Sequence, residues 1–354
     1  MKHHLKKAIE IIARRLHVWE FLYFMAGIFM RKKLLAVFTY HRVTGKDGSE
    51  KYFLGYDRGL DSGIFELQIK AIKKYFTIID LDEFLDIIQG KSTPASHSAL
   101  LTFDDTDADF VEHAHPVLRR HNCPCVNFAP TGCIDTDNRF WHLRISNIFF
   151  NLDAESWKSL RDRIGGLPDR LRSIIEESSV DSRDEKTISC RRVLIFLKNM
   201  DIAEREHLVD EFEKAAGFDY TLGIDCMTWR ELARMEENGV KIESHTDMHP
   251  ELARVDRERI KSELDISMKA LEKNLNKKVR TLCYPAGSFD DRVLEVMAES
   301  DYEAGFASQH FTCRYPLDGY DPYRIPRFGM HGENEDDIHG YLGKIIVKRI
   351  LKGH

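Results

Sequence analysis

The 354-residue chain is predicted to form an α/β fold, with a mainly parallel sheet whose strands are joined by crossover helices. Two observations predict this fold class. Short apolar runs, typical of strands that are buried on both faces, alternate with segments in which apolar residues recur at helical spacing. Two of the helical segments also begin at a capping box and end at a glycine, which marks their limits. Parallel strands need such crossover connections.

The pattern begins with a continuous apolar run at 34–41, which predicts a buried strand. A helix is expected around 65–72, where phenylalanine and isoleucine recur at helical spacing, and the short β-branched run at 76–79 predicts the next strand. The capping box that begins at Asp80 then predicts a helix that ends at Gly90.

The alternation continues through the rest of the chain. A second capping box at Thr228 begins a helix that ends at Gly239. The remaining expected strands are at 99–103, 125–129, 240–243 and 279–283, and the remaining expected helices are over 111–118, 256–275 and 292–300.

One stretch interrupts this alternation. From 141 to 223 the apolar positions fit helices, and no convincing strand lies between them. Because the strand pattern resumes afterwards, we interpret 141–223 as a helical insertion within one domain of residues 34–354.

The composition limits the class of protein. The chain has 52 Lys and Arg against 58 Asp and Glu, a formal net charge of −6, whereas a dedicated nucleic-acid binder would show a basic excess. With 43% hydrophobic residues the chain is too apolar for wholesale disorder. Its 7 cysteines are odd in number and scattered in a protein too large to need disulfide staples, so a reducing compartment is expected.

The first 33 residues differ from the rest in charge. Residues 1–33 contain eight Lys or Arg and two Glu, which give them a net charge of +6. The apolar run at 18–30 is shorter than the ~20 residues that span a bilayer, and no small-residue cleavage site follows it, so a removable signal peptide is not expected. Two alternatives remain for 1–33: a helix packed on the body of the protein, or a basic amphipathic helix that lies on an anionic membrane surface.

Polar and ionisable side chains follow three of the predicted strands. Asp104 and Asp105 come directly after 99–103, His245 and His249 follow the strand at 240–243, and residues 284–288 follow the strand at 279–283. Active sites of parallel α/β folds form at the carboxyl ends of the strands.

These residue types can bind a metal. Adjacent carboxylates after a buried strand are costly unless a cation compensates them, and two histidines separated by three residues can converge on one divalent ion with an open position for water. Each pair alone has an ordinary explanation, as a helix N-cap or as a solvated histidine pair. Their combination at the ends of two buried strands favours a metal site.

Three motifs connect these positions with a known family. Thr102-Phe103-Asp104-Asp105, His245-Thr246-Asp247-Met248-His249 and Tyr284-Pro285-Ala286-Gly287 resemble, in this order, the first three motifs of the polysaccharide deacetylases, also called the NodB-homology or carbohydrate esterase family 4 group. The resemblance extends over 34–41, 65–84, 250–252 and 324–327. It implies a distorted (β/α) barrel of about seven strands and metal-dependent removal of acetyl groups from N-acetylated sugars.

The resemblance also implies roles for individual residues. Asp105, His245 and His249 would be the metal ligands, and zinc is the expected ion for a mixed imidazole and carboxylate set. Asp104 would be the general base that accepts a proton from metal-bound water. The backbone N–H of Ala286 would hold the oxyanion.

The chain departs from the family pattern around the proposed base. The glycine that usually follows the aspartate pair is Thr106, and the arginine of the third motif falls at Cys283. Another residue must then orient the base, and Arg324 and Arg327 are the candidates. The aromatic position of the third motif is Ala286.

Three further residues are candidates for substrate contact or proton transfer. The late histidine that many members use as general acid has no clear equivalent; His331 is the nearest candidate, and a surface-loop histidine is the competing explanation. His41, at the end of the first strand, either faces the substrate groove or forms a hydrogen bond in the barrel mouth. Tyr284 of the third motif is expected to contact the substrate.

We therefore predict a metal-dependent N-deacetylase that acts on a glycan or a lipid-linked sugar. Two alternatives stay open: an amidohydrolase of the same fold that acts on a small non-sugar amide, and an inactive glycan-binding scaffold. The expected location is the cytoplasm, with peripheral contact at the inner face of the membrane through 1–33 as the alternative, and no nucleic-acid partner is expected.

Overall fold

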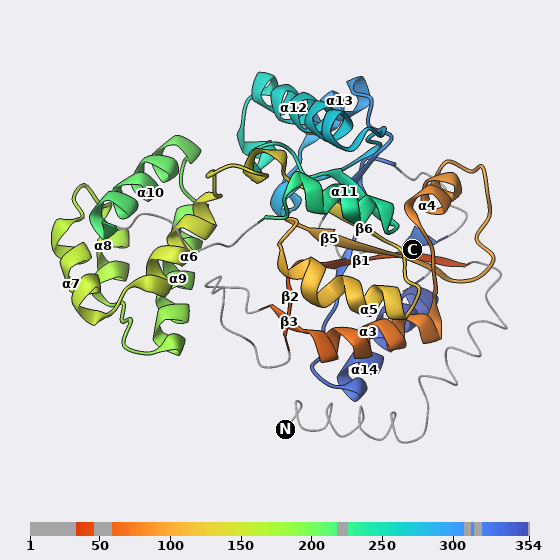
Figure 1. The fold of residues 1–354 in the computed structure, drawn as a ribbon, viewed down its shortest axis with the longest axis horizontal. Coiled ribbons are helices and arrows are strands. Elements are labelled where there is room, and N and C mark those ends of the chain that lie inside the picture. The colour runs from red at the N-terminus through yellow and green to blue at the C-terminus, as the bar shows by residue number, and fades with distance from the viewer. Residues whose placement is uncertain (1–32, 46–58, 218–225, 308–312, 315–320, 353–354) are drawn as a thin grey trace. The chain divides into compact units, whose positions relative to one another are not determined.

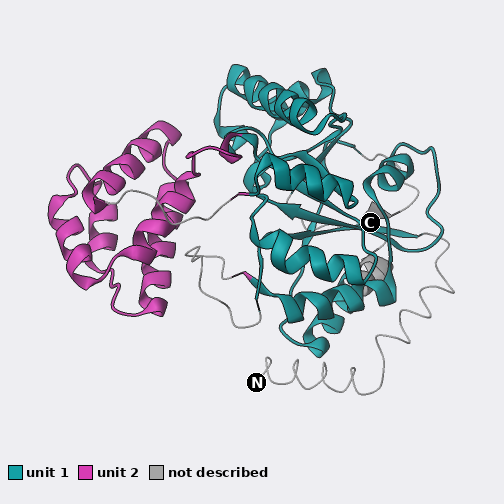
Figure 2. Ribbon diagram, viewed as in Figure 1, with its two compact units in different colours: residues 1–46, 60–131, 227–354 teal, residues 47–59, 132–226 magenta. Residues whose placement is uncertain are grey.

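The computed structural model describes residues 33–45, 59–217, 226–307, 313–314 and 321–352. The chain divides into two compact units, of which the first comprises 1–46, 60–131 and 227–354 and the second comprises 47–59 and 132–226 (Figure 2). The helix expected at 1–33 lies outside the described residues apart from Lys33, so both interpretations of it stay predictions.

A parallel α/β barrel forms the first unit (Figure 1). Its main strands follow one another around the barrel in the order β1 (Leu34–Tyr40), β5 (Ser98–Asp104), β6 (Cys125–Ala129), β7 (Val240–Ser244), β8 (Thr281–Cys283) and β9 (Ala304–Ala307). At the far side, β11 (Ile325–Pro326) pairs with β9 and β12 (Phe328–Gly329) pairs with β1, both in parallel. The segment 325–329 therefore closes the ring, which confirms the predicted distorted barrel.

Shorter strands extend this sheet. β4 (Thr77–Ile78) pairs with the beginning of β5, β10 (Cys313–Arg314) pairs antiparallel with β1, and β2 (Val43–Thr44) and β3 (Leu60–Asp61) pair with each other.

Helices cover the outside of the barrel (Figure 1). They are α3 (Ser62–Tyr75), α4 (Leu81–Ile88), α5 (His115–Arg120), α11 (Trp229–Glu237), α12 (Arg257–Leu275), α13 (Asp291–Glu299) and α14 (Glu335–Lys352). α3 contacts α5 and α14, and α12 contacts α11 and α13. In the described part of the chain, no helix combines the length and the apolar character that crossing a bilayer requires.

Apolar residues fill one end of the barrel, so a polar site can form only at the other end. Val37, Leu100 and Phe128 lie in one buried cluster with Phe84 of α4 and other residues of that helix. Asp82 of α4 also lies beside Lys241 and Arg280, near the beginnings of β7 and β8, so α4 packs against the end of the barrel where the strands begin. Apolar side chains therefore close that end, and polar side chains gather where the strands finish.

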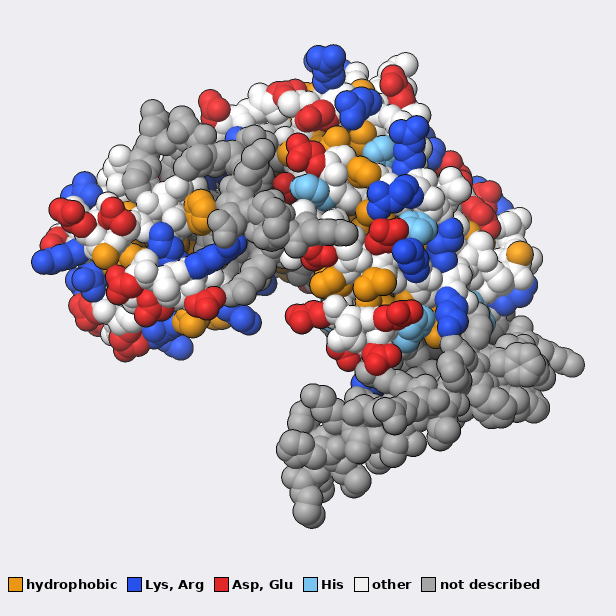
Figure 3. Space-filling model, turned by 60° about the horizontal axis from the view of Figure 1, so that its bottom comes forward, with side chains coloured by type: hydrophobic (Ala, Val, Ile, Leu, Met, Phe, Trp, Pro, Cys, Tyr) orange, Lys and Arg blue, Asp and Glu red, His pale blue; other side chains and the backbone are white. Residues whose placement is uncertain are grey.

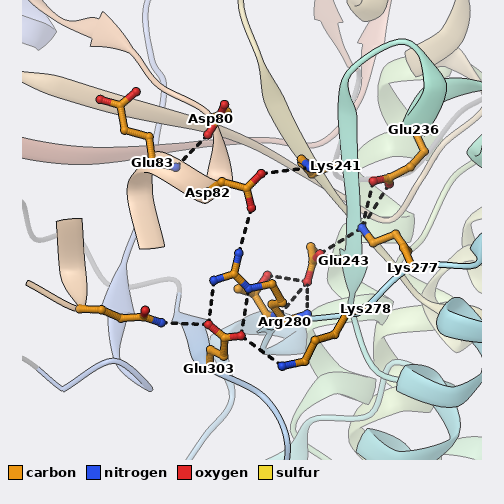
Figure 4. Close-up of polar contacts among 12 residues, drawn as sticks. Asp80, Asp82, Glu83, Glu236, Lys241, Glu243, Lys277, Lys278, Arg280 and Glu303 are labelled. Carbon is orange, nitrogen blue, oxygen red and sulfur yellow. Dashed lines mark hydrogen bonds and ion pairs between the residues drawn. The ribbon is translucent and has the colours of Figure 1, made fainter. Parts of the chain in front are cut away.

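Ion pairs hold α4 against the beginnings of the strands (Figure 4). Asp82 of α4 lies 3.2 Å from the ammonium of Lys241 in β7 and 2.9 Å from the guanidinium of Arg280, which directly precedes β8. Arg280 also contacts Glu303 at 2.8 Å, next to β9. One carboxylate thus links α4 to two neighbouring strands.

A buried carboxylate replaces part of the pairing between β7 and β8. Glu243 accepts hydrogen bonds from the main-chain N–H groups of Arg280 at 2.8 Å and Thr281 at 2.6 Å, and the ammonium of Lys277 lies 3.1 Å away (Figure 4). β8 begins at Thr281, two residues later than the apolar pattern predicts, and the N–H of Val279 donates to Glu272 instead of to a strand.

The second unit is helical. Its helices are α6 (Trp141–Asn151), α7 (Ala154–Arg163), α8 (Asp169–Glu176), α9 (Arg183–Lys198) and α10 (Ile202–Ala216). They enclose their own buried cluster, which includes Phe149, Trp157 and Phe212. All elements described between 141 and 216 are helices, as the spacing of the apolar residues indicates.

The closing strands leave no room for a side chain at Gly305. A Cβ there would lie 2.2 Å from the hydroxyl oxygen of Tyr284 and 3.0 Å from the carbonyl oxygen of Tyr323. We predict that Gly305→Ala lowers the free energy of unfolding by about 1–3 kcal/mol, because these packed groups must shift. Gly165→Ala is the control, since nothing lies within 4 Å of its added methyl group. Urea denaturation measures both, and equal stabilities would contradict the prediction.

Candidate metal centre and catalytic site

The chain turns sharply as soon as β5 ends. Asp105 and Thr106 both have left-handed backbone conformations, with φ of 72° and 53°. This region is unfavourable for residues with a Cβ, above all for a β-branched threonine. The hydroxyl of Thr106 donates to the carbonyl of Asp105 at 2.7 Å, and the carbonyl of Thr106 accepts from Met227 at 2.8 Å. These two hydrogen bonds therefore hold Thr106 in a turn conformation that glycine would adopt more easily.

Asp105 lies between the two predicted histidine ligands. Its Oδ1 is 3.4 Å from Nε2 of His245 and 3.4 Å from Nε2 of His249. This oxygen is buried and has no hydrogen-bond partner among the described residues. Burial alone would raise the pKa of Asp105, but the two imidazoles lower it well below the usual 3.8. An ionised, buried and unpartnered oxygen between two imidazole nitrogens is what a cation site requires.

The carbonyl of Cys283 fixes the orientation of His245. Nδ1 of His245 lies 2.8 Å from this carbonyl oxygen, which can only accept, so Nδ1 carries the proton. In the neutral ring the lone pair is then on Nε2, the atom that faces Asp105. This is the arrangement in which a second hydrogen bond orients a histidine for metal ligation.

A buried glutamate holds the loop that carries both histidines. Glu263 of α12 is 1% exposed and accepts from the main-chain N–H groups of Asp247 at 2.9 Å and Met248 at 2.7 Å. The hydroxyl of Thr131 also donates to Asp247, at 2.7 Å. Glu263 was not among the residues predicted from the sequence. The available signal was its position on the stripe that α12 buries, next to Leu264.

The residues present fit a divalent metal. One ligand atom each from Asp105, His245 and His249 lie within 4.8 Å of one another. Asp104, His245 and Cys283 form a second such group, but it is less suitable. Both oxygens of Asp104 are engaged elsewhere, and burial raises the pKa of the Cys283 thiol, which therefore stays protonated. A carboxylate with two imidazoles suits zinc and other divalent ions.

Asp104 forms a buried ion pair with Arg327. Nη1 of Arg327 donates to Oδ1 at 2.7 Å and Nη2 donates to Oδ2 at 2.7 Å, and the two side chains are 1% and 4% exposed respectively. Burial would raise the pKa of Asp104, but the charge and hydrogen bonds of Arg327 lower it to about 2. Asp104 is therefore ionised at neutral pH.

The structure distinguishes between the two candidate arginines. Arg324 is half-exposed and lies 3.1 Å from Asp321 and 3.4 Å from Asp291 at the surface. Only Arg327 reaches Asp104, because it lies between β11 and β12 at the point where the barrel closes.

Two predicted histidines have different surroundings. Nε2 of His41 lies 3.8 Å from Oδ2 of Asp104, and the side chain is 48% exposed, so His41 borders the barrel mouth. His331 is exposed and its ring packs against Tyr341, with centroids 5.1 Å apart. Among the contacts of the described residues, none joins His331 to Asp104 or to the metal group. Its role as general acid stays a prediction.

The third motif supplies an exposed turn and a buried tyrosine. Ala286 is exposed and left-handed, with φ of 52°. Tyr284 is 0% exposed, its hydroxyl donates to the carbonyl of Tyr323 at 2.8 Å, and its ring packs on Phe289. The expectation that Tyr284 contacts substrate is therefore corrected: its hydroxyl is directed to the barrel wall, and the side chain supports the turn from below.

Part of the chain matches known proteins in sequence. The sequence model of the family described as "Polysaccharide deacetylase" matches residues 184–305, a range that includes both histidines and the third motif but not the aspartate pair. A poly-beta-1,6-N-acetyl-D-glucosamine N-deacetylase of Staphylococcus aureus (strain MSSA476) is 32% identical over 99 residues, which are 28% of this chain and 30% of that protein. The chain thus matches less than a third of the length of such curated relatives.

Solved structures share the fold. The deacetylase PplD of Streptococcus pyogenes, in complex with acetate, has a TM-score of 0.54 at 15% identity and covers 89% of this chain and 99% of its own. IcaB from Ammonifex degensii has a TM-score of 0.54 at 15% identity and covers 88% of this chain and 97% of its own. These structures support the barrel fold, and the family match confirms the relationship to polysaccharide deacetylases that the motifs predict.

Replacing Arg327 tests the buried ion pair. We predict that Arg327→Gln lowers the free energy of unfolding by about 3–5 kcal/mol, because it leaves a buried carboxylate unpaired. The pKa of Asp104 is lowered from 3.8 to about 2, so the stabilisation is complete above the usual pKa and is lost as the pH falls through about 2. Urea denaturation over this pH range should therefore show the difference from the parent protein narrowing in acid.

Arg324→Gln is the matched control for this prediction. It removes the same charge three residues away, from surface ion pairs that contribute about 0–1 kcal/mol. If both variants lost the same stability, the prediction that the buried pair of Asp104 and Arg327 contributes more than a surface ion pair would be refuted.

Proposed function

We propose that the barrel is a metal-dependent N-deacetylase that removes acetyl groups from an N-acetylated glycan or a lipid-linked sugar. The observation that carries the proposal is a buried oxygen of Asp105 that has no hydrogen-bond partner in the described part of the chain. It lies 3.4 Å from each of two imidazole nitrogens, and Asp105 is next in sequence to an ionised second acid. The relative from Staphylococcus aureus is named a poly-beta-1,6-N-acetyl-D-glucosamine N-deacetylase, which supports an acetamido sugar as substrate.

Each group of the site has a task in amide hydrolysis. Asp105, His245 and His249 would hold a divalent metal, which would polarise the acetamide carbonyl and lower the pKa of the attacking water. Asp104 accepts the proton of that water. The N–H of Ala286, on its exposed turn, donates to the carbonyl oxygen as negative charge develops there.

Arg327 both positions and weakens the proposed base. Its two hydrogen bonds fix both oxygens of Asp104, which keeps the carboxylate in one orientation. The same contacts lower the pKa of Asp104 to about 2, far below the value near 7 that makes a base most effective at neutral pH. The site therefore relies on a precisely placed and always ionised base rather than a strong one.

The direct test is acetate release by the purified full chain with added Zn²⁺, Co²⁺ or Mn²⁺. The substrates are oligomers of β-1,6-linked N-acetylglucosamine, chito-oligosaccharides, peptidoglycan fragments and small non-sugar amides. We expect release from the acetylated sugars and complete loss after chelation. Release from the small amides alone would replace the proposal by an amidohydrolase of the same fold, and no release with any metal would favour a glycan-binding scaffold.

Two neighbouring variants separate metal binding from proton transfer. Asp105→Asn should lose bound metal and activity together, because it removes the anionic ligand. Asp104→Asn should retain metal and lose turnover by ~10²- to 10⁴-fold, the usual contribution of a general base. Metal content by mass spectrometry and acetate release are measured on the same preparations. Turnover of the Asp104 variant at the parental rate would show that Asp104 is not the base.

A further inference from the structure

A basic groove lies on the outside of the barrel between α5 and α11. A hollow of about 670 Å³ is bordered by His115, Arg119, Arg120, Arg234 and Asn238, together with apolar residues of the α5 region. A second hollow of about 240 Å³ shares some of these side chains and continues to the loop before β6. α5 and α11 each end just before β6 and β7 begin, so the groove lies at the opposite end of the strands from the candidate metal centre.

The arginines of this groove differ in their partners. Arg120 contacts Glu66 at 3.1 Å. Arg119 and Arg234 have no carboxylate partner among the ion pairs of the described residues, and no acidic residue borders either hollow. The pKa of His115 is lowered by burial and then by the charges of Arg119 and Arg234. The positive charges of Arg119 and Arg234, which no carboxylate of the described residues neutralises in an ion pair, therefore both reach His115 in the groove.

The donors of the groove match an oxyanion. Guanidinium groups present parallel N–H donors in a fixed geometry that suits phosphate oxygens, and the amide of Asn238 adds a neutral donor. On the barrel face that is turned toward the viewer in Figure 3, Lys, Arg and His side chains adjoin one another, with Asp and Glu side chains among them. We propose that the groove between α5 and α11 binds a phosphate group through Arg119 and Arg234.

The helix dipole gives a simpler reason for basic residues here, because helix C-termini favour cations. That reason applies to each helix end separately. It does not explain why arginines from two different helix ends border one hollow, or why no acidic residue borders that hollow. A phosphate with two negative charges would compensate both guanidiniums at once.

A phosphate in this groove would touch none of the proposed catalytic residues. The proposal therefore does not depend on the proposed function, and it assigns the groove to anchoring or regulation rather than to the reaction. The same chemistry occurs in a phospholipid headgroup and in a soluble phosphate, and the experiment must distinguish these sources.

The test uses the full chain with Arg119→Gln and Arg234→Gln combined. Arg170→Gln and Arg191→Gln combined, on α8 and α9 of the second unit, form the control, which loses the same two positive charges. Calorimetric titration with inorganic phosphate should show binding that is weaker by about tenfold or more in the double variant and unchanged in the control, since two charged hydrogen-bond donors are lost. Absence of binding to the parent protein, or equal binding by the double variant, would overturn the proposal.

A second measurement identifies the source. Flotation with vesicles of phosphatidylglycerol and, separately, phosphatidylcholine is compared for the double variant and the control, both with residues 1–33 present. A selective loss with phosphatidylglycerol assigns the groove to a lipid headgroup. Unchanged flotation together with lost phosphate binding assigns it to a soluble phosphate. Deacetylase activity on soluble sugars should be the same in all three proteins.

Discussion

The buried pair of Asp104 and Arg327 connects the closing of the barrel with the arrangement of its site. Arg327 lies between β11, which pairs with β9, and β12, which pairs with β1. Removing two charges from water costs several kcal/mol per ion, and only close, well-oriented hydrogen bonds offset that cost. These bonds exist only when the segment 325–329 is in register on both sides. The orientation of the proposed base therefore depends on the same strand register that completes the barrel.

The three loops around the site are held in unfavourable backbone conformations. Asp105, Thr106, Thr246, His249 and Ala286 all have positive φ, and they are five of the eight non-glycine residues of this kind in the described chain. Each such conformation costs on the order of 1–3 kcal/mol and persists only where surrounding contacts impose it. The carboxylate of Glu263, the carbonyl of Cys283 and the N–H of Met227 supply such contacts. The strain is evidence that the fold imposes the positions of the candidate ligands.

The fold was largely predictable because burial leaves a periodic pattern in the sequence, and the strand ends could be located from it. The group of Asp105, His245 and His249 was predictable from motifs at those ends. Contacts between segments distant in sequence could not be predicted in this way. Arg324 and Arg327 are the same residue type three positions apart, and only the closing register shows which one reaches Asp104. The orientation of Tyr284 likewise depends on the space left at Gly305, which no local pattern encodes.

Cys283 stands where the family pattern has an arginine, and this difference leaves Arg327 as the arginine that pairs with Asp104. Sγ of Cys283 lies 3.7 Å from Oδ2 of Asp104, the same oxygen that Nη2 of Arg327 binds. A guanidinium at position 283 would compete with Arg327 for that oxygen and place two cations in the barrel mouth. The neutral thiol leaves the contact to Arg327, while the main-chain carbonyl of Cys283 still orients His245. The identities at 283 and 327 are therefore coupled through Asp104, with one cation supplied from the closing segment in place of the third motif.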